Sequence, residues 1–272
     1  MKAGAYRKYG RYVAQRLNRL EFVIIVILNL KMKRILLLVV LFLFATSCFA
    51  QSVKFSINAG LSESTFSEPF TPNGKAILVN GQTISKSFVT GYNVGGLVDF
   101  TIKRVSIQTG LVYTVIGGTN NDHFNVPGNS YPYIFSDKQT LNLNYLQVPI
   151  NVLYHIPTKF GSVFVGGGPY VAYGLSGKYK SNSTTALNDV TTTTATKGDV
   201  IFGNGQQGKY DFGNGPYVKN PDYGVNAIAG ISLKNKIRLS AGYGFGIENL
   251  SHSIFTKGRN DVLSISIGYT FD

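Results

Sequence analysis

The stretch that decides the fold is Leu263-Ser264-Ile265-Ser266-Ile267-Gly268-Tyr269-Thr270-Phe271, in which large apolar side chains alternate with small or polar ones. Successive side chains of a β-strand point to opposite faces, so this alternation predicts a strand with one apolar and one polar face. Seven further segments alternate in the same way: residues 53–61, 92–102, 105–115, 141–154, 163–175, 223–233 and 237–247. The sequence therefore predicts eight strands and an all-β fold.

The segment 141–154 departs from simple alternation. Its apolar residues lie at odd positions up to Tyr145 and at even positions from Leu146 onward. We expect a β-bulge near residues 145–146 to restore the register, and a bulge there also helps to accommodate Pro149 in a central strand.

The connections between the expected strands alternate in length. Three are short: residues 103–104, 155–159 and 234–236. Four are long and rich in Ser, Thr, Asn and Gly: residues 62–86, 119–140, 176–222 and 248–261. Short turns at one end and long loops at the other are typical of an outer-membrane barrel, whereas a soluble barrel of the lipocalin kind is the alternative.

The sizes of the side chains on the two faces separate these alternatives. The polar face consists mostly of Gly, Ser, Asn and Thr, which fit the narrow interior of an eight-stranded barrel. The other face consists of Leu, Ile, Val, Phe and Tyr, with almost no charge to meet water. We therefore expect an eight-stranded antiparallel up-and-down transmembrane β-barrel with its apolar face toward lipid.

Composition and charge exclude several classes of protein. Only 14% of the 272 residues are charged and 44% are hydrophobic, which disfavours both a charge-coated cytosolic enzyme and a disordered chain. The net charge is +13, but residues 1–34 hold nine Lys or Arg and one Glu, a balance of +8. The remainder carries only +5, so we expect no nucleic-acid partner.

The N-terminal segment has the pattern of an export signal. Met32-Lys33-Arg34 precedes an apolar run over residues 35–45 and a small-residue exit that ends at Ala50. This pattern predicts a signal peptide that starts at Met32 and is cleaved between Ala50 and Gln51. Residues 1–50 would then form a leader and residues 51–272 the barrel domain.

Two other interpretations of the leader stay open. Residues 22–30 and 35–44 could form an N-terminal membrane anchor, although each is shorter than the ~20 residues that a spanning helix needs. Cys48, the only cysteine, could carry a lipid anchor. With one cysteine, an internal disulfide is excluded.

Several short motifs occur in a characteristic order: Asn144-Tyr145-Leu146-Gln147-Val148-Pro149-Ile150, Gly167-Gly168-Pro169-Tyr170, Gly174-Leu175-Ser176-Gly177-Lys178, Asp222-Tyr223-Gly224, Gly242-Tyr243-Gly244 before Glu248-Asn249-Leu250, and Gly268-Tyr269-Thr270-Phe271 at the end. In these motifs the chain resembles the PorT-like outer-membrane β-barrel family of Bacteroidota. Gln147 stands where that family often has Glu, which removes one charge from the lumen. The resemblance implies a fold and a location, and no reaction.

A group of polar side chains is expected inside the barrel near its short turns. The inward charges are Lys54, Asp99 and Arg238, and we expect Lys54 to pair with Asp99 on the adjacent strand because a buried charge needs a partner. Gln108, Gln147 and Asn151 would extend this lumen polar cluster. A plug that closes the lumen is the favoured interpretation, and a gate or an ion site is the alternative.

The sequence predicts neither a metal site nor a cofactor. His123, His155 and His252 are expected in a long loop, a short turn and another long loop, without metal-ligand spacing. Ser251-His252-Ser253 with Glu248 resembles the Ser/His/acid set of lipid-A-deacylating barrels. Neighbouring residues of a strand point to opposite faces, however, which works against catalysis by His252.

The long loops are the expected binding surface. Residues 181–196 are rich in Thr and predict either a mobile surface loop or an extended hairpin above the membrane. We therefore expect a monomeric, non-catalytic outer-membrane protein, exported through the inner membrane and surrounded by outer-membrane lipid. Both mature termini would lie in the periplasm, and the protein would act as a surface or assembly component that binds partners through the four long loops.

Two alternative functions are also compatible with the sequence. The first is a porin-like channel for small solutes, with a water path beside the small inward residues Gly166, Gly168, Gly242 and Gly244. The second is a lipid-modifying enzyme that depends on His252.

Overall fold

The computed structural model of the chain describes residues 52–67, 77–79, 82–126, 133–187, 190–203, 216–248, 250 and 258–271. These residues form thirteen strands: β1 (Ser52–Ser67), β2 (Ile77–Val79), β3 (Gln82–Ser87), β4 (Val89–Ile102), β5 (Val105–Val126), β6 (Tyr133–Thr158), β7 (Gly161–Leu187), β8 (Val190–Asp199), β9 (Ile201–Phe202), β10 (Tyr217–Val218), β11 (Asp222–Leu233), β12 (Ile237–Gly246) and β13 (Arg259–Phe271). No helix among the described residues is long and apolar enough to cross a membrane. The predictions for residues 1–50, including cleavage between Ala50 and Gln51, lie outside the described residues.

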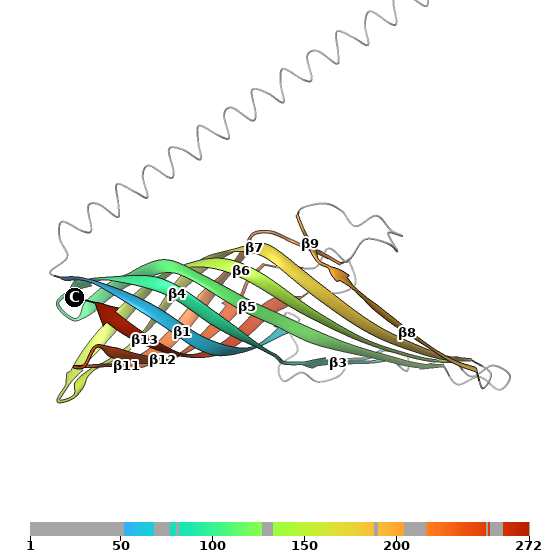
Figure 1. Cartoon of the computed structure of the whole chain (residues 1–272). Coiled ribbons are helices and arrows are strands. Elements are labelled where there is room, and N and C mark those ends of the chain that lie inside the picture. The colour runs from blue at the N-terminus through green and yellow to red at the C-terminus, as the bar shows by residue number, and fades with distance from the viewer. Residues whose placement is uncertain are drawn as a thin grey trace, which may run out of the picture. The chain divides into compact units, whose positions relative to one another are not determined.

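Eight of the strands form a closed ring (Figure 1). The order around the ring is β1, β4, β5, β6, β7, β11, β12 and β13, and β13 pairs back with β1. Every neighbouring pair in the ring is antiparallel. Closure removes the free edges that an open sheet would expose. The prediction of an eight-stranded antiparallel β-barrel is confirmed.

The two faces of the wall differ as the alternation predicts. On β1 and β13 the outward side chains are apolar and exposed, with Leu61 at 67% and Ile265 at 69% of their full accessible area. The inward side chains Ser56, Asn58 and Ser62 are buried. The apolar side chains thus form an outer belt suited to lipid, and the polar ones line the interior.

One end of the ring carries the short turns, and we call it the turn end. Residues 103–104, 159–160 and 234–236 connect strands there, and β1 begins and β13 ends beside them. The expected turn at residues 155–159 is therefore shorter than predicted, because β6 continues to Thr158.

At the opposite, distal end, three strands continue far beyond the ring. β5, β6 and β7 have 22, 26 and 27 residues, whereas the alternation predicted about 10–14. With β3 and β8 their outer parts form a distal sheet, which we define as residues 82–87, 119–126, 133–142, 178–187 and 190–199. Much of the chain expected as long loops is thus strand. Of the two interpretations of residues 181–196, the extended hairpin is correct.

The expected shift of phase in β6 is wrong. From Leu141 to His155 its odd-numbered residues point inward, and Tyr145 and Leu153 are both fully buried. The irregularity lies opposite Asn144 and Tyr145 but on β7, where Leu175 is the extra residue between two consecutive pairs. Leu141, Leu143 and Tyr145 therefore face the interior despite being apolar.

These inward apolar residues belong to a core at the distal mouth of the barrel. Two short parallel strands, β9 and β10, bring Phe202 and Val218 onto it, and the ring of Phe202 meets that of Tyr145 edge-on at 5.6 Å between centroids. The buried members of this distal cap are Ile116, Leu141, Leu143, Tyr145, Tyr170, Ala172, Val200, Val218 and Leu250. An apolar interior at this end thus replaces the small polar lining expected from the sequence.

Candidate functional site

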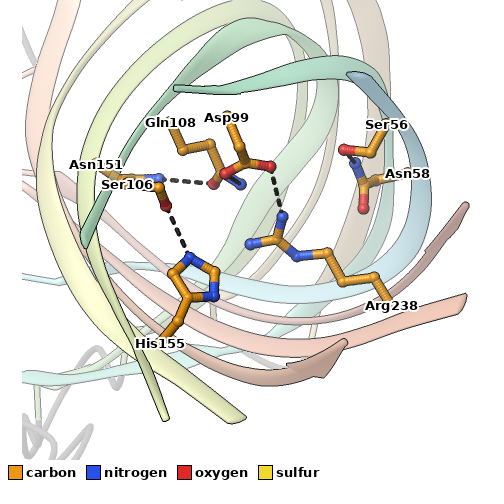
Figure 2. A network of polar contacts seen from close by, with 8 residues as sticks. All are labelled: Ser56, Asn58, Asp99, Ser106, Gln108, Asn151, His155 and Arg238. Atoms are coloured by element: carbon orange, nitrogen blue, oxygen red, sulfur yellow. Dashed lines mark hydrogen bonds and ion pairs between the residues drawn. The ribbon is translucent and has the colours of Figure 1, made fainter. Parts of the chain in front are cut away.

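A network of polar side chains crosses the lumen near the turn end (Figure 2). Arg238 on β12 donates from Nη1 to Oδ2 of Asp99 on β4 at 2.8 Å, and the two side chains are only 4% and 7% exposed. Nε2 of Gln108 donates to Oδ1 of Asp99 at 2.9 Å, and Nδ2 of Asn151 donates to Oε1 of Gln108 at 3.4 Å. We call these four residues the ionic layer.

Strand register explains why three of these four residues lie together. Asp99, Gln108 and Asn151 are directly opposite one another on the adjacent strands β4, β5 and β6. They therefore form a row of polar groups on the inner wall. Arg238 reaches this row from the far side of the ring, because β12 is separated from β4 by two strands. Such a charge-assisted pair across a narrow lumen ties opposite walls together.

Aromatic side chains also fill the lumen at the level of the ionic layer. The guanidinium of Arg238 lies over the ring of Phe164, 4.0 Å from its centroid, and Phe164 is fully buried. His155 packs beside the same ring, and its Nε2 makes a 2.8 Å hydrogen bond with Oγ of Ser106. A Cβ on Gly230 would collide with the Phe164 ring, so only glycine admits the ring at this position.

A second polar group lies near the distal cap. Nδ2 of Asn260 donates to Oδ2 of Asp222 at 2.8 Å, and the hydroxyl of Tyr170 donates to the same oxygen at 3.5 Å. Asp222 and Asn260 are each 1% exposed. Neither residue is among those that the sequence predicted for the lumen. Extending the inward phase of residues 223–233 and 263–271 backward would have placed them on the inner face.

Cavities lie between and beside the ionic layer and the second polar group, which we call the two polar layers. One of about 140 Å³ is lined by residues of both layers, including Gln108, Tyr145 and Asp222, and an adjoining one measures about 80 Å³. A vestibule of about 370 Å³ opens at the turn end, lined by Lys54, Lys234 and other residues. Asp99 and Arg238 line this vestibule, Arg238 also lines the smaller inner cavity, and Gln108 lines both inner cavities. The ionic layer therefore separates the vestibule from the interior.

The residues predicted for the lumen polar cluster occupy different places. Asp99, Gln108, Asn151 and Arg238 form the ionic layer, and Gln147 lines the inner cavity beyond it. Lys54 is exposed at the vestibule, and Asp99 pairs with Arg238 although Lys54 is opposite it in the strand register. The expected Lys54–Asp99 pair is therefore replaced by a pair across the lumen, which only ring closure brings together.

His155 and His123 lie in places other than those expected. His155 is in β6 with its side chain in the lumen, and His123 is in β5 on the distal sheet. Ser251, His252 and Ser253 lie outside the described residues, while Glu248 forms a 3.3 Å ion pair with Lys219. In the described part of the chain, no group of three His, Cys, Asp or Glu side chains is arranged to hold a metal ion.

Comparison with known proteins gives a family. A family model described as outer membrane protein beta-barrel domain matches residues 49–252, most of the chain. Similar solved structures include Ail of Yersinia pestis in complex with the heparin analogue sucrose octasulfate (12% identity, 81% of this chain and 100% of that chain, TM-score 0.34). Neisserial surface protein A is another (12% identity, 82% and 99%, TM-score 0.32). The chain matches no curated protein.

Proposed function

Because the chain belongs to the outer membrane protein β-barrel family and is located in the outer membrane, we propose that it is a non-catalytic surface component that binds partners through its distal sheet and loops. In an outer-membrane barrel the short turns face the periplasm and the long connections face the exterior. The turn end would then be periplasmic, and the distal sheet extracellular. We further propose that the protein is monomeric, is exported with a signal peptide that ends at Ala50, and is a PorT-like member of the family.

The observation that carries this proposal is the contrast between a blocked lumen and an extended outer sheet. The ionic layer, Phe164 and the distal cap fill the interior at two levels. An eight-stranded barrel has an interior just wide enough for its own side chains. A solute path therefore has less support than a role at the surface.

The distal sheet offers a suitable binding edge. Among the described strands, β8 pairs only with β7, so its outer edge presents backbone N–H and C=O groups to solvent. Its side chains are almost all exposed, and they are mostly threonine. An extended segment of a partner can add to such an edge as a further strand.

The alternative, a small-solute channel, draws support from the inner cavities. Gly242 and Gly244 line the larger one, and a Cβ on Gly244 would meet no atom closer than 3.3 Å. Planar-bilayer conductance of the purified protein separates the two functions. We expect a silent bilayer, and discrete conductance steps that disappear when the pore is occluded would favour the channel.

Photocrosslinking in intact cells tests the surface role directly. A crosslinking residue at Thr193 on the edge strand β8 should give a discrete adduct, whereas one at Ile267 on the lipid-facing belt should give none. Absence of an adduct at Thr193 and at a second β8 position, Ala195, would contradict the proposal, provided that the protein is folded in the outer membrane.

A further inference from the structure

The outward face of the distal sheet carries four exposed lysines, which we call the lysine patch: Lys138 on β6, Lys178 and Lys180 on β7, and Lys197 on β8. Lys180 is directly opposite Lys197 in the strand register, and Lys178 is directly opposite Asp199. Lys138 lies diagonally from Lys180, whose direct partner on β6 is Thr140. Residues opposite each other on neighbouring strands share a face, so the four ammonium groups converge on one surface.

The patch has an excess of positive charge. In the described part of the distal sheet, Asp199 is the acidic residue of this face, and it lies 3.6 Å from Lys178 with both side chains more than 80% exposed. Asp137 belongs to the opposite face, where it accepts hydrogen bonds from Ser181 at 2.7 Å and Ser183 at 2.8 Å. Four lysines and one aspartate leave three net positive charges. Like charges directly opposite each other destabilise a sheet, so the Lys180–Lys197 pair favours an anionic ligand.

The patch continues the surface that meets lipid. On β7 the apolar belt ends at Tyr173 and Leu175, which are 59% and 52% exposed, and the bulge at Leu175 brings Lys178 and Lys180 onto the same outward face. A strand rises about 3.3 Å per residue, so these lysines lie about 10–17 Å beyond Leu175 along the strand. A strand tilt of about 45° places them roughly 7–12 Å above the hydrocarbon. This height corresponds to the headgroups of the outer leaflet.

We propose that the lysine patch binds the phosphate groups of the phosphorylated glycolipid of the outer leaflet, lipopolysaccharide. The inference rests on the position of the patch next to the lipid belt and on its charge, and it adds a lipid ligand to the partner-binding role proposed above. The ε-ammonium of lysine is a compact charge with three donors, suited to phosphate oxygens whose exact positions vary. Adjacent lysines near an anionic membrane surface each add to the attraction.

A charge-matched pair of variants tests the proposal. Lys180→Gln/Lys197→Gln removes the directly opposed pair, and the control Lys159→Gln/Lys234→Gln removes two exposed lysines from the short turns. The full-length protein, purified in zwitterionic detergent, is titrated with lipopolysaccharide in 150 mM salt. We expect the patch variant to bind about tenfold to thirtyfold more weakly than the wild type, and the control variant to bind like the wild type.

Further titrations identify the source of the phosphate. Dephosphorylated lipopolysaccharide should bind the wild type as weakly as intact lipopolysaccharide binds the patch variant, and millimolar inorganic phosphate should not displace the lipid. Equal binding by the patch variant and the wild type would overturn the proposal. Equal binding of a heparin fragment and lipopolysaccharide would also overturn it, because the surface would then serve soluble polyanions. A heat-modifiable gel shift verifies that each variant is folded.

Discussion

The lumen and the distal sheet share the strands β5, β6 and β7, but their polar groups have opposite relations to water. In the lumen, Asp99 and Arg238 are in contact at 2.8 Å with their side chains almost fully buried. On the distal sheet, Lys178 and Asp199 are 3.6 Å apart with more than 80% of each side chain exposed. The first pair holds opposite walls of the ring together without solvent. The second is in open solvent, so of these two acid–base pairs only the buried one is expected to have a structural role.

The two regions show that the core of a narrow membrane barrel differs from that of a soluble domain. A soluble domain buries its apolar side chains, whereas this ring turns most of them outward and uses polar groups and a smaller set of aliphatic and aromatic side chains as its core. A polar core requires that its members be paired. We therefore expect substitutions in the lumen to lower the free energy of unfolding far more than equivalent substitutions on the distal sheet.

The largest effect is expected from Asp99→Ala. Removal of the carboxylate leaves the buried guanidinium of Arg238 without its anion, and breaking such a pair costs about 3–5 kcal/mol. Urea-induced unfolding of the barrel in lipid vesicles measures the loss. Asp99→Ala/Arg238→Met, which removes the stranded charge as well, should recover at least half of the lost stability. A midpoint for Asp99→Ala equal to that of the wild type would show that the ionic layer is not structural.

The second-largest loss of stability is expected in the distal cap. Leu143 is fully buried in the cap, so Leu143→Ala leaves a cavity that we expect to cost about 2–5 kcal/mol. The neighbouring Asn142→Ala, at an exposed position of the same strand, is the control. If the two variants unfold at the same urea concentration, the cap does not contribute to the stability of the ring.

Two glycines of the inner wall give a matched comparison. A Cβ on Gly230 would collide with the ring of Phe164, whereas one on Gly242 would meet its nearest atom, Oγ of Ser264, at 3.1 Å. We expect Gly230→Ala to cost about 1–3 kcal/mol and Gly242→Ala less than about 1 kcal/mol. The same unfolding assay decides, and a larger loss for Gly242→Ala would mean that the cavity, rather than the aromatic layer, is the tightly packed part.

The smallest effect is expected at the exposed pair. Lys178→Gln removes an ion pair in open solvent, which contributes less than about 0.5 kcal/mol. The unfolding midpoint should therefore stay within error of the wild type in low and in high salt. A loss comparable to that of Asp99→Ala would remove the distinction between the two regions.

Much of the ring could be predicted from the sequence because its signal is local. The alternation in Leu263-Ser264-Ile265 and its counterparts reports directly which side chains face lipid and which face the lumen. The members of the ionic layer could be identified from the sequence for the same reason, since a charged or amide side chain in the inward phase of an apolar strand stands out. The error at Tyr145 has the same origin. Alternation assigns apolar side chains to the lipid face, and it contains no information about an apolar core inside the barrel.

The sequence by itself thus determined the number of ring strands, the face that each presents to lipid outside residues 141–145, and the identity of the inward charges, because these depend only on the two-residue period of a strand. Tertiary structure decided the partner of Asp99, the length of β5 to β7 and the contents of the distal mouth. These features depend on which distant segments meet. Arg238 reaches Asp99 only because the ring closes, and Val200, Val218 and Leu250 join Tyr145 in one core only because segments far apart in the chain meet at the same opening.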